Sequence, residues 1–220
     1  MLCKPYNLQT MNHATVLTGD VIGSTLAGPA GTDATLGLIR SVVLDPDSLL
    51  GRDVRFSRYR GDGWQVYSSD PDRVFRICVL ILANLHSHPD LPRTRISAAC
   101  GAVSSLPETG LASASGEAFT LSGRGLDAIK RRKLVYAQAE GQAVWKASLF
   151  RLLEWLAFRW SPEQAQAIAM CFRLDPPHPG KSTEELGISR QAFSARLDGA
   201  GYAPLLEADL AFRSERTDRP

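Results

Sequence analysis

A tight glycine-rich hairpin constrains the fold of this chain most strongly. Two strand-like apolar runs, residues 54–59 and 64–67, are separated by Gly61-Asp62-Gly63. Glycine readily adopts the positive φ angles that tight hairpin turns require. The pattern therefore predicts two antiparallel strands, with Asp62 in the turn between them.

A second aspartate, Asp20, ends another strand-like run at residues 14–20. If this strand lies beside the hairpin, Asp20 and Asp62 meet at one end of the sheet, where two carboxylates repel each other unless a cation joins them. Mg²⁺ binds one or two carboxylates together with substrate phosphates, so the pair predicts a nucleotide–metal site. The alternative is two aspartates that only form turns, a common role for this residue.

The segment after Asp20 is rich in small residues, Gly23-Ser24-Thr25. Backbone N–H groups ahead of a helix bind phosphate well. We therefore expect this segment to hold the phosphates of a nucleotide beside the metal.

The order of the predicted elements indicates the fold class. Strands are predicted at 14–20, 53–60, 64–68 and 94–102, and helices at 33–44 and 71–86. This βαββαβ order is that of the ferredoxin-like split unit, an α+β fold, with helices on one face of the sheet. A helix at 116–132 and a short strand at 134–138 are expected after it.

Three motifs together resemble the class III nucleotidyl cyclases. The sequence Asp20-Val21-Ile22-Gly23-Ser24-Thr25 and the hairpin turn Gly61-Asp62-Gly63 are similar to the two metal-binding motifs of that family. The stretch from Gly116 to Arg124 is similar to its Gly-x-x-Val-Asn-x-x-x-Arg motif. The order and rough spacing agree over residues 13 to about 140, and the chain also resembles the SatD-like proteins, which carry a similar domain.

The resemblance implies a palm-like cyclase core that uses Mg²⁺ or Mn²⁺. Asp20, Asp62 and the Val21 carbonyl would hold the ions, the ribose 3′-hydroxyl would attack the α-phosphorus, and pyrophosphate would leave. Arg124 stands at the position of the transition-state arginine. The resemblance also implies a homodimer with sites shared between subunits, and nucleotide contacts from Gly23, Ser24, Thr25, Arg58, Gly61 and Ser113.

The chain departs from this family at Thr120, which replaces the asparagine that orients the ribose. A threonine hydroxyl can donate one hydrogen bond but reaches less far. Arg124 also has an alternative role as a surface arginine of its helix. Two functions therefore stay open, cyclisation of a nucleoside triphosphate and nucleotide sensing without cyclisation.

The composition changes near residue 143. Residues 143–160 predict a helix with apolar side chains on more than half of its circumference, which is typical of a helix buried on two sides. It would serve as a linker or dimer helix, or pack on the sheet of its own domain. We therefore expect a cyclase-like domain at 1–142, this helix, and a small all-α domain at 161–220.

The last part of the chain resembles a helix-turn-helix module. Leu186-Gly187-Ile188-Ser189 would form its turn, and Phe193 and Leu197 would be buried. The residues predicted to face DNA are Ser189, Arg190, Gln191, Ser194 and Arg196. Residues 151–220 carry nine Lys or Arg against ten Asp or Glu, which disfavours nonspecific DNA binding. A transcriptional regulator with a vestigial core and a helical packing module both stay open.

Two short polar clusters have ordinary explanations. Lys130-Arg131-Arg132-Lys133 is predicted to end the helix at 116–132, where cations are favourable; phosphate or nucleic-acid contact is the alternative. His86-Ser87-His88 is predicted to be the end of a helix rather than a metal site.

The bulk composition indicates a cytoplasmic protein. The net charge of +2 does not specify a partner, and Cys3, Cys78, Cys100 and Cys171 form no Cys-x-x-Cys pair, as expected for free thiols in a reducing compartment. No apolar run approaches the about 20 residues of a membrane helix, and no secretory signal is visible. The first residue would be Met1 or Met11.

Overall fold

A computed structural model describes residues 13–46, 53–129, 131–139, 144–173, 176 and 179–214. Its centre is a mixed sheet with the order β2-β3-β1-β4-β5, in which β6 also pairs with β4. The strands are β1 (His13–Val21), β2 (Val54–Tyr59), β3 (Gly63–Ser68), β4 (Thr94–Ser105), β5 (Ser115–Gly116) and β6 (Leu134–Tyr136). The pairs β2–β3, β3–β1 and β1–β4 are antiparallel, which confirms the predicted ferredoxin-like order.

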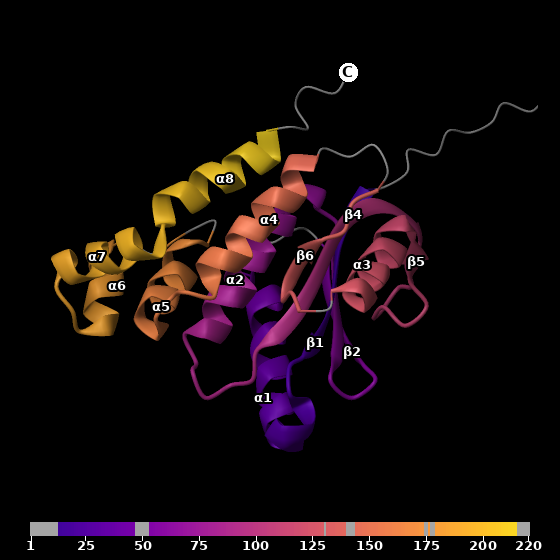
Figure 1. Ribbon diagram of the computed structural model, residues 1–220, viewed down its shortest axis with the longest axis horizontal. Helices are drawn as coiled ribbons and strands as arrows, with labels where there is room; N and C mark the ends of the chain where they lie inside the picture. The colour runs from indigo at the N-terminus through magenta and orange to yellow at the C-terminus, as the bar shows by residue number, and fades with distance from the viewer. Residues whose placement is uncertain are drawn as a thin grey trace, which may run out of the picture.

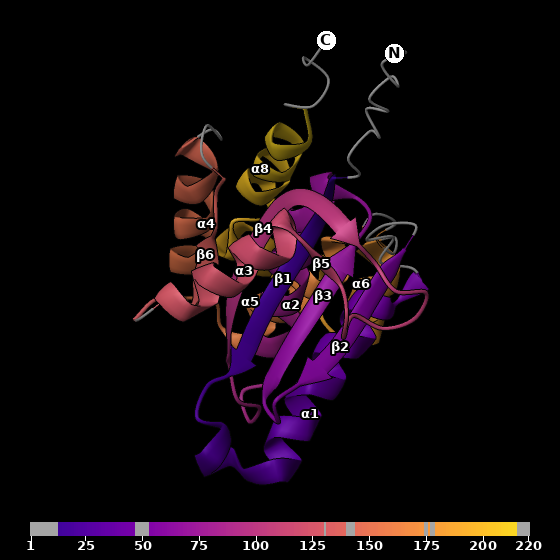
Figure 2. The same cartoon turned by 90° about the vertical axis from the view of Figure 1, so that its right-hand side faces the viewer.

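Helices α1 (Ser24–Leu44) and α2 (Val74–His86) cover one face of the sheet, and α2 follows a short 3-10 turn, η2 (Pro71–Arg73). Helix α3 (Glu117–Ala128) lies on the other face, in front of the sheet in Figure 2 (Figures 1 and 2). Successive side chains of a β-strand point to opposite faces of the sheet, so β1 contributes to the core on both faces. Leu17 belongs to the large core under α1 and α2, whereas Val16 belongs to a smaller core with Phe119 of α3.

Helix α1 begins nine residues before the predicted start at residue 33. It contains a kink at Gly28, whose φ of 69° lies in the left-handed region. Pro29 follows the kink, where it starts a new helical segment and its missing N–H costs no hydrogen bond. The kink separates a single turn next to the end of β1 from the longer segment that packs on the sheet.

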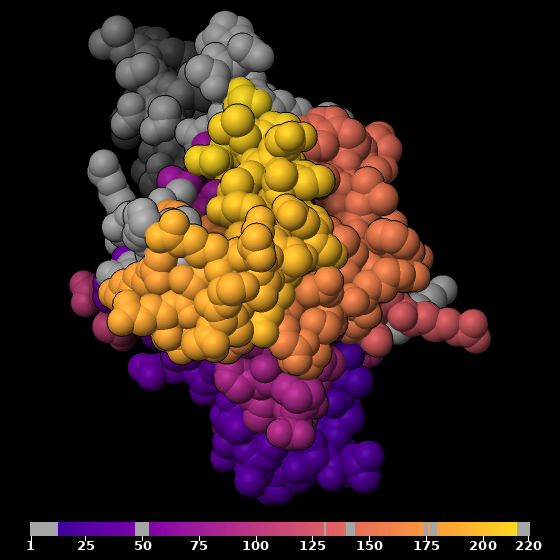
Figure 3. All heavy atoms as spheres, turned by 90° about the vertical axis from the view of Figure 1, so that its left-hand side faces the viewer, coloured from indigo at the N-terminus to yellow at the C-terminus, as the bar shows by residue number. Residues whose placement is uncertain are grey.

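Within the described residues, five helices follow the sheet, and three of them, the first, second and fifth, pack directly on the outside of α2 (Figures 1 and 3). The five helices are α4 (Val144–Ala157), α5 (Pro162–Cys171), α6 (Pro179–Leu186), α7 (Arg190–Ala200) and α8 (Tyr202–Ser214). Phe75 of α2 contacts both Phe150 of α4 and Phe212 of α8, with ring centroids 5.7 and 6.4 Å apart. The C-terminal helices therefore share one hydrophobic cluster with the sheet.

A buried ion pair also joins these helices to α2. The Nη2 atom of Arg76 lies 2.6 Å from Asp209 of α8, and both side chains are almost fully buried. Arg76 Nη1 donates a second hydrogen bond, 2.7 Å long, to the carbonyl of Phe172 at the end of α5. One α2 side chain thus contacts both α8 and the end of α5.

Helices α6 and α7 are joined by the short turn that the sequence predicts. Gly187 has a φ of 63°, and Ser189 caps α7 by accepting a hydrogen bond from the Ala192 N–H. Phe193 is buried, as expected, and packs with residues of α5. The turn chemistry of this segment is therefore confirmed.

No helix in the ranges given above has the length and apolar character of a membrane span.

Candidate functional site

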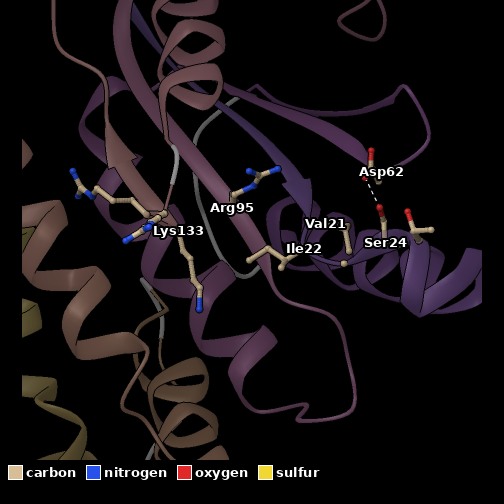
Figure 4. A pocket seen from close by; sticks show the side chains of 10 residues that line it. Val21, Ile22, Ser24, Asp62, Arg95 and Lys133 are labelled. Atoms are coloured by element: carbon tan, nitrogen blue, oxygen red, sulfur yellow. Dashed lines mark hydrogen bonds between the residues drawn. The ribbon is translucent and has the colours of Figure 1, made fainter.

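A pocket of about 440 Å³ opens at the end of the sheet where β1 finishes (Figure 4). Its lining combines four segments far apart in the sequence: the β1–α1 connection, the β2–β3 turn, the start of β4, and the connection from α3 to β6. The lining residues are Val21, Ile22, Gly23, Ser24, Thr25, Asp62, Arg95, Arg131, Arg132 and Lys133.

The register of β1 and β3 brings Asp20 and Asp62 together. Asp20 pairs with Gly63, the residue after Asp62, and the Val21 N–H donates to the Asp62 carbonyl over 3.2 Å. Gly61 has a φ of 79°, so the turn takes the positive φ that the sequence predicts. The two aspartates lie at the same end of the sheet, as expected.

Asp20 is held by an arginine that the sequence analysis did not single out. Arg95 pairs with Asp20 across β1 and β4, and its Nε donates to Asp20 Oδ1 over 2.8 Å. Its Nη2 donates to the other carboxylate oxygen. The hydrogen bond to Asp20 is the main cause that raises the pKa of Arg95 above its ordinary value, against the opposing effect of burial.

Asp62 is held from the other side of the pocket. Its Oδ2 accepts a hydrogen bond of 2.5 Å from the hydroxyl of Ser24, the first residue of α1. Gly23 has a φ of 68°, which lets the chain turn from β1 into that helix. The N–H groups of Ser24 and Thr25 precede the first intrahelical hydrogen bonds, so they are free to meet an anion in the pocket.

The basic cluster lies in the connection between α3 and β6, not at the end of a helix. Helix α3 ends at Ala128, whereas the prediction extended it to residue 132. Arg131, Arg132 and Lys133 therefore leave the helix and line the pocket; Lys130 lies outside the described residues. Figure 4 shows Lys133 and Ser24 on opposite sides of Arg95.

Other predicted site residues lie outside this pocket. Thr120 and Arg124 are exposed on the outer side of α3, and the Thr120 hydroxyl donates to the Gly116 carbonyl over 3.1 Å. Ser113 is exposed in the loop before β5. Arg58 forms an ion pair of 2.7 Å with Asp33 of α1.

The oxygen donors present suit a magnesium ion in kind. Asp20, Asp62 and the neighbouring Val21 carbonyl supply hard oxygen ligands, which Mg²⁺ prefers. Arg95 neutralises one of these carboxylates. Arg95 and a metal would therefore compete for the Asp20 carboxylate. Within the described residues, no group of three or more His, Cys, Asp or Glu side chains is placed to hold an ion without help from a ligand.

Comparison with known proteins finds similarity in solved structures only. No family model matches the chain, and no curated protein matches it. An adenylate cyclase from Trypanosoma brucei in its monomeric state gives a TM-score of 0.42 at 12% identity, over 51% of this chain and 66% of that one. The guanylyl cyclase Cya2 gives 0.38 at 17% identity, over 53% and 70%.

A bacterial light-regulated adenylyl cyclase gives a TM-score of 0.41 at 19% identity, over 56% of this chain and 42% of that chain. The solved structures named here are thus all nucleotidyl cyclases. Each likeness covers about half of this chain, and this chain spans slightly less than two thirds of the Trypanosoma protein.

Proposed function

We propose that this protein binds a nucleoside triphosphate together with Mg²⁺ or Mn²⁺ in the pocket at the end of β1. One observation carries the proposal: Asp62 lines a pocket that is also lined by arginine and lysine, and the sheet register places Asp20 beside Asp62, opposite Gly63. A bound metal would neutralise phosphate charge beside the two aspartates. Without a metal, the two carboxylates would repel a phosphate chain. A site that binds phosphate through cations alone would have no use for the carboxylates, so a metal explains why both are present.

Each part of the pocket has a distinct role in this proposal. Asp20, Asp62 and the Val21 carbonyl hold the metal. The N–H groups of Gly23 to Thr25 bind phosphate oxygens, because these residues line the pocket and their N–H groups have no helical acceptors. Arg95 lies beside Asp20 and exchanges its carboxylate partner for a phosphate when the ligand enters, since a guanidinium binds either in bidentate fashion.

We infer that a second copy of the chain completes the site. Thr120 and Arg124 are one helical turn apart and exposed on α3, away from their own pocket. A homodimer would allow them to reach the partner's pocket, where Arg124 would stabilise the charge that develops on the phosphates. Arg58, Gly61 and Ser113 would contact the nucleotide base or sugar. With Thr120 present, the dimer would act as a nucleotidyl cyclase or as a nucleotide sensor.

Incubation with each of the four ribonucleoside triphosphates and Mg²⁺ or Mn²⁺ tests the proposal. Pyrophosphate release and product mass are followed, and binding is measured by calorimetry. Product that disappears in Asp62→Ala supports a cyclase, and its mass names the nucleotide. Binding without product, lost in Asp62→Ala, supports a sensor. Absence of binding for all four triphosphates refutes the proposal.

A second candidate function is DNA binding by α7. Ser189, Arg190, Gln191 and Ser194 are exposed along the start of this helix, and Arg196 is half-buried. The helix lies at the edge of the molecule, away from the sheet (Figure 1). If α7 binds DNA, the protein should shift the electrophoretic mobility of DNA, and Arg190→Ala should abolish the shift. Retention of the shift in that variant would count against this function.

A further inference from the structure

The basic edge of the pocket is the segment Arg131–Lys133, and it adjoins the start of β4. Ile96 and Leu134 are neighbours in the parallel β4–β6 pair, and the Ile96 N–H donates to the Lys133 carbonyl over 2.8 Å. Arg95 and Lys133 directly precede these two residues. The strand pairing therefore brings the basic segment to the same end of the sheet as Arg95 and Asp20.

The cations of this edge divide into two groups. Arg95 is paired with Asp20, and Arg132 lies 3.3 Å from Glu154 of α4. Arg131 and Lys133 are exposed and have no carboxylate partner within the described part of the chain. The Lys133 ammonium instead lies 4.5 Å from the centroid of the Phe158 ring. Neither charge is neutralised by a carboxylate there, so both can pair with an anionic ligand at the rim of the pocket, Lys133 by leaving the Phe158 ring.

Glu154 fixes the backbone of this segment. Its side chain is 9% exposed, and it accepts hydrogen bonds of 2.6 Å from the Lys133 N–H and 2.6 Å from Arg151, besides the contact with Arg132. Although burial raises the pKa of the Glu154 carboxyl, these hydrogen bonds lower it more, so the net pKa lies below its ordinary value. The ionised Glu154 carboxylate therefore holds residues 131–133 in place through the Lys133 N–H and the Arg132 side chain.

We propose that Arg131 and Lys133 bind the terminal phosphates of the ligand and that Glu154 is the positioning residue that holds them at the pocket. The inference rests on the proposed triphosphate function and deepens it. The N–H groups of Gly23 to Thr25 and Arg95 lie at one side of the pocket, and Arg131 and Lys133 lie at the other. A chain of several phosphates spans both sides, whereas a single phosphate contacts only one.

Calorimetry with two base-free probes, inorganic tripolyphosphate and inorganic phosphate, tests this in the presence of Mg²⁺. Loss of charge-assisted hydrogen bonds predicts that the double variant Arg131→Gln/Lys133→Gln binds tripolyphosphate at least about tenfold more weakly. Its affinity for inorganic phosphate should change by less than about twofold. Arg40→Gln, which removes an exposed cation from α1, is the matched control and should bind both probes as the original chain does.

The positioning role has its own readout. Glu154→Gln should weaken tripolyphosphate binding by about tenfold, and adding it to the double variant should cause no further loss, because both act through one segment. Additive losses would show that Glu154 does not act through Arg131 and Lys133, and would overturn its positioning role.

An unchanged tripolyphosphate affinity in Arg131→Gln/Lys133→Gln overturns the inference. The proposed function survives that result if a nucleoside triphosphate still binds and Asp62→Ala abolishes its binding. If tripolyphosphate does not bind the original chain, the inference also fails. If Glu154→Gln does not fold, the variant Arg131→Gln/Lys133→Gln still decides the test, because its two positions are exposed.

Discussion

The buried histidine at the end of α2 makes the stability of this protein depend on pH. His86 is 7% exposed, and its Nε2 has no hydrogen-bond partner within the described residues. Its ring meets the Phe158 ring edge to face, with centroids 4.7 Å apart. Burial, followed by the nearby charges of Arg93 and Lys133, lowers the pKa of His86 from 6.5 to about 4.

The sign of the effect follows from proton binding. Between pH 6.5 and about 4 the unfolded chain protonates this histidine while the folded protein keeps it neutral. The contribution to stability is therefore complete above pH 6.5 and is lost as the pH falls towards 4. The full shift corresponds to about 3 kcal/mol, and about 2 kcal/mol of it is lost between pH 7 and pH 5.

The assay is urea unfolding of the original chain and of His86→Phe at both pH values. Phenylalanine keeps an aromatic ring against Phe158 and cannot titrate. Any cost of its larger ring is common to both pH values and cancels. The free energy of unfolding of the original chain should fall by about 2 kcal/mol more than that of His86→Phe on going from pH 7 to pH 5.

His88→Phe, at an exposed position two residues further on, controls for an added aromatic ring at this end of the helix. Between pH 7 and pH 5, the free energy of unfolding of His88→Phe should fall by as much as that of the original chain. Equal losses in His86→Phe and the original chain would refute the reasoning, because carboxylates would then account for the whole pH dependence.

Three further predictions concern stability and the metal site. Asp209→Ala leaves the buried Arg76 guanidinium without its main partner and should lower the free energy of unfolding by about 3–5 kcal/mol, which Arg76→Met/Asp209→Leu should largely restore; a loss below about 1 kcal/mol in urea unfolding would contradict this. Gly19→Ala would place a methyl group 2.6 Å from the Arg95 carbonyl and against the buried Trp64 ring. The free energy of unfolding should therefore fall by about 3 kcal/mol, seen as a lower urea midpoint. An unchanged midpoint would be inconsistent with this packing. Arg95→Ala frees Asp20, so Mn²⁺ should bind about tenfold more tightly without nucleotide, measured by calorimetry; an unchanged affinity would show that Arg95 does not compete with the metal.

The sequence and the structure agree best where neighbouring residues control the conformation. Gly61 and Gly63 predict the hairpin because only the local backbone angles of the turn are at stake. The helix predicted at 71–86 is found as α2 (Val74–His86) for the same reason, because helix formation depends on residues close together in the chain. Disagreements lie at element ends: α3 ends before the basic cluster, and α1 begins before its kink.

The sequence by itself therefore determined the order of the strands along the chain and the hairpin turn that carries Asp62, and it predicted that Asp20 and Asp62 meet if β1 lies beside the hairpin, which the β1–β3 pairing shows. Only the tertiary structure decided that Arg95 pairs with Asp20, because that contact depends on the register of β1 and β4, which pair residues 75 positions apart. It also decided that Glu154 holds the segment from Arg131 to Lys133, through the packing of α4 beside β6. Such contacts leave no local pattern, because side chains far apart in the chain meet only when the whole core has packed.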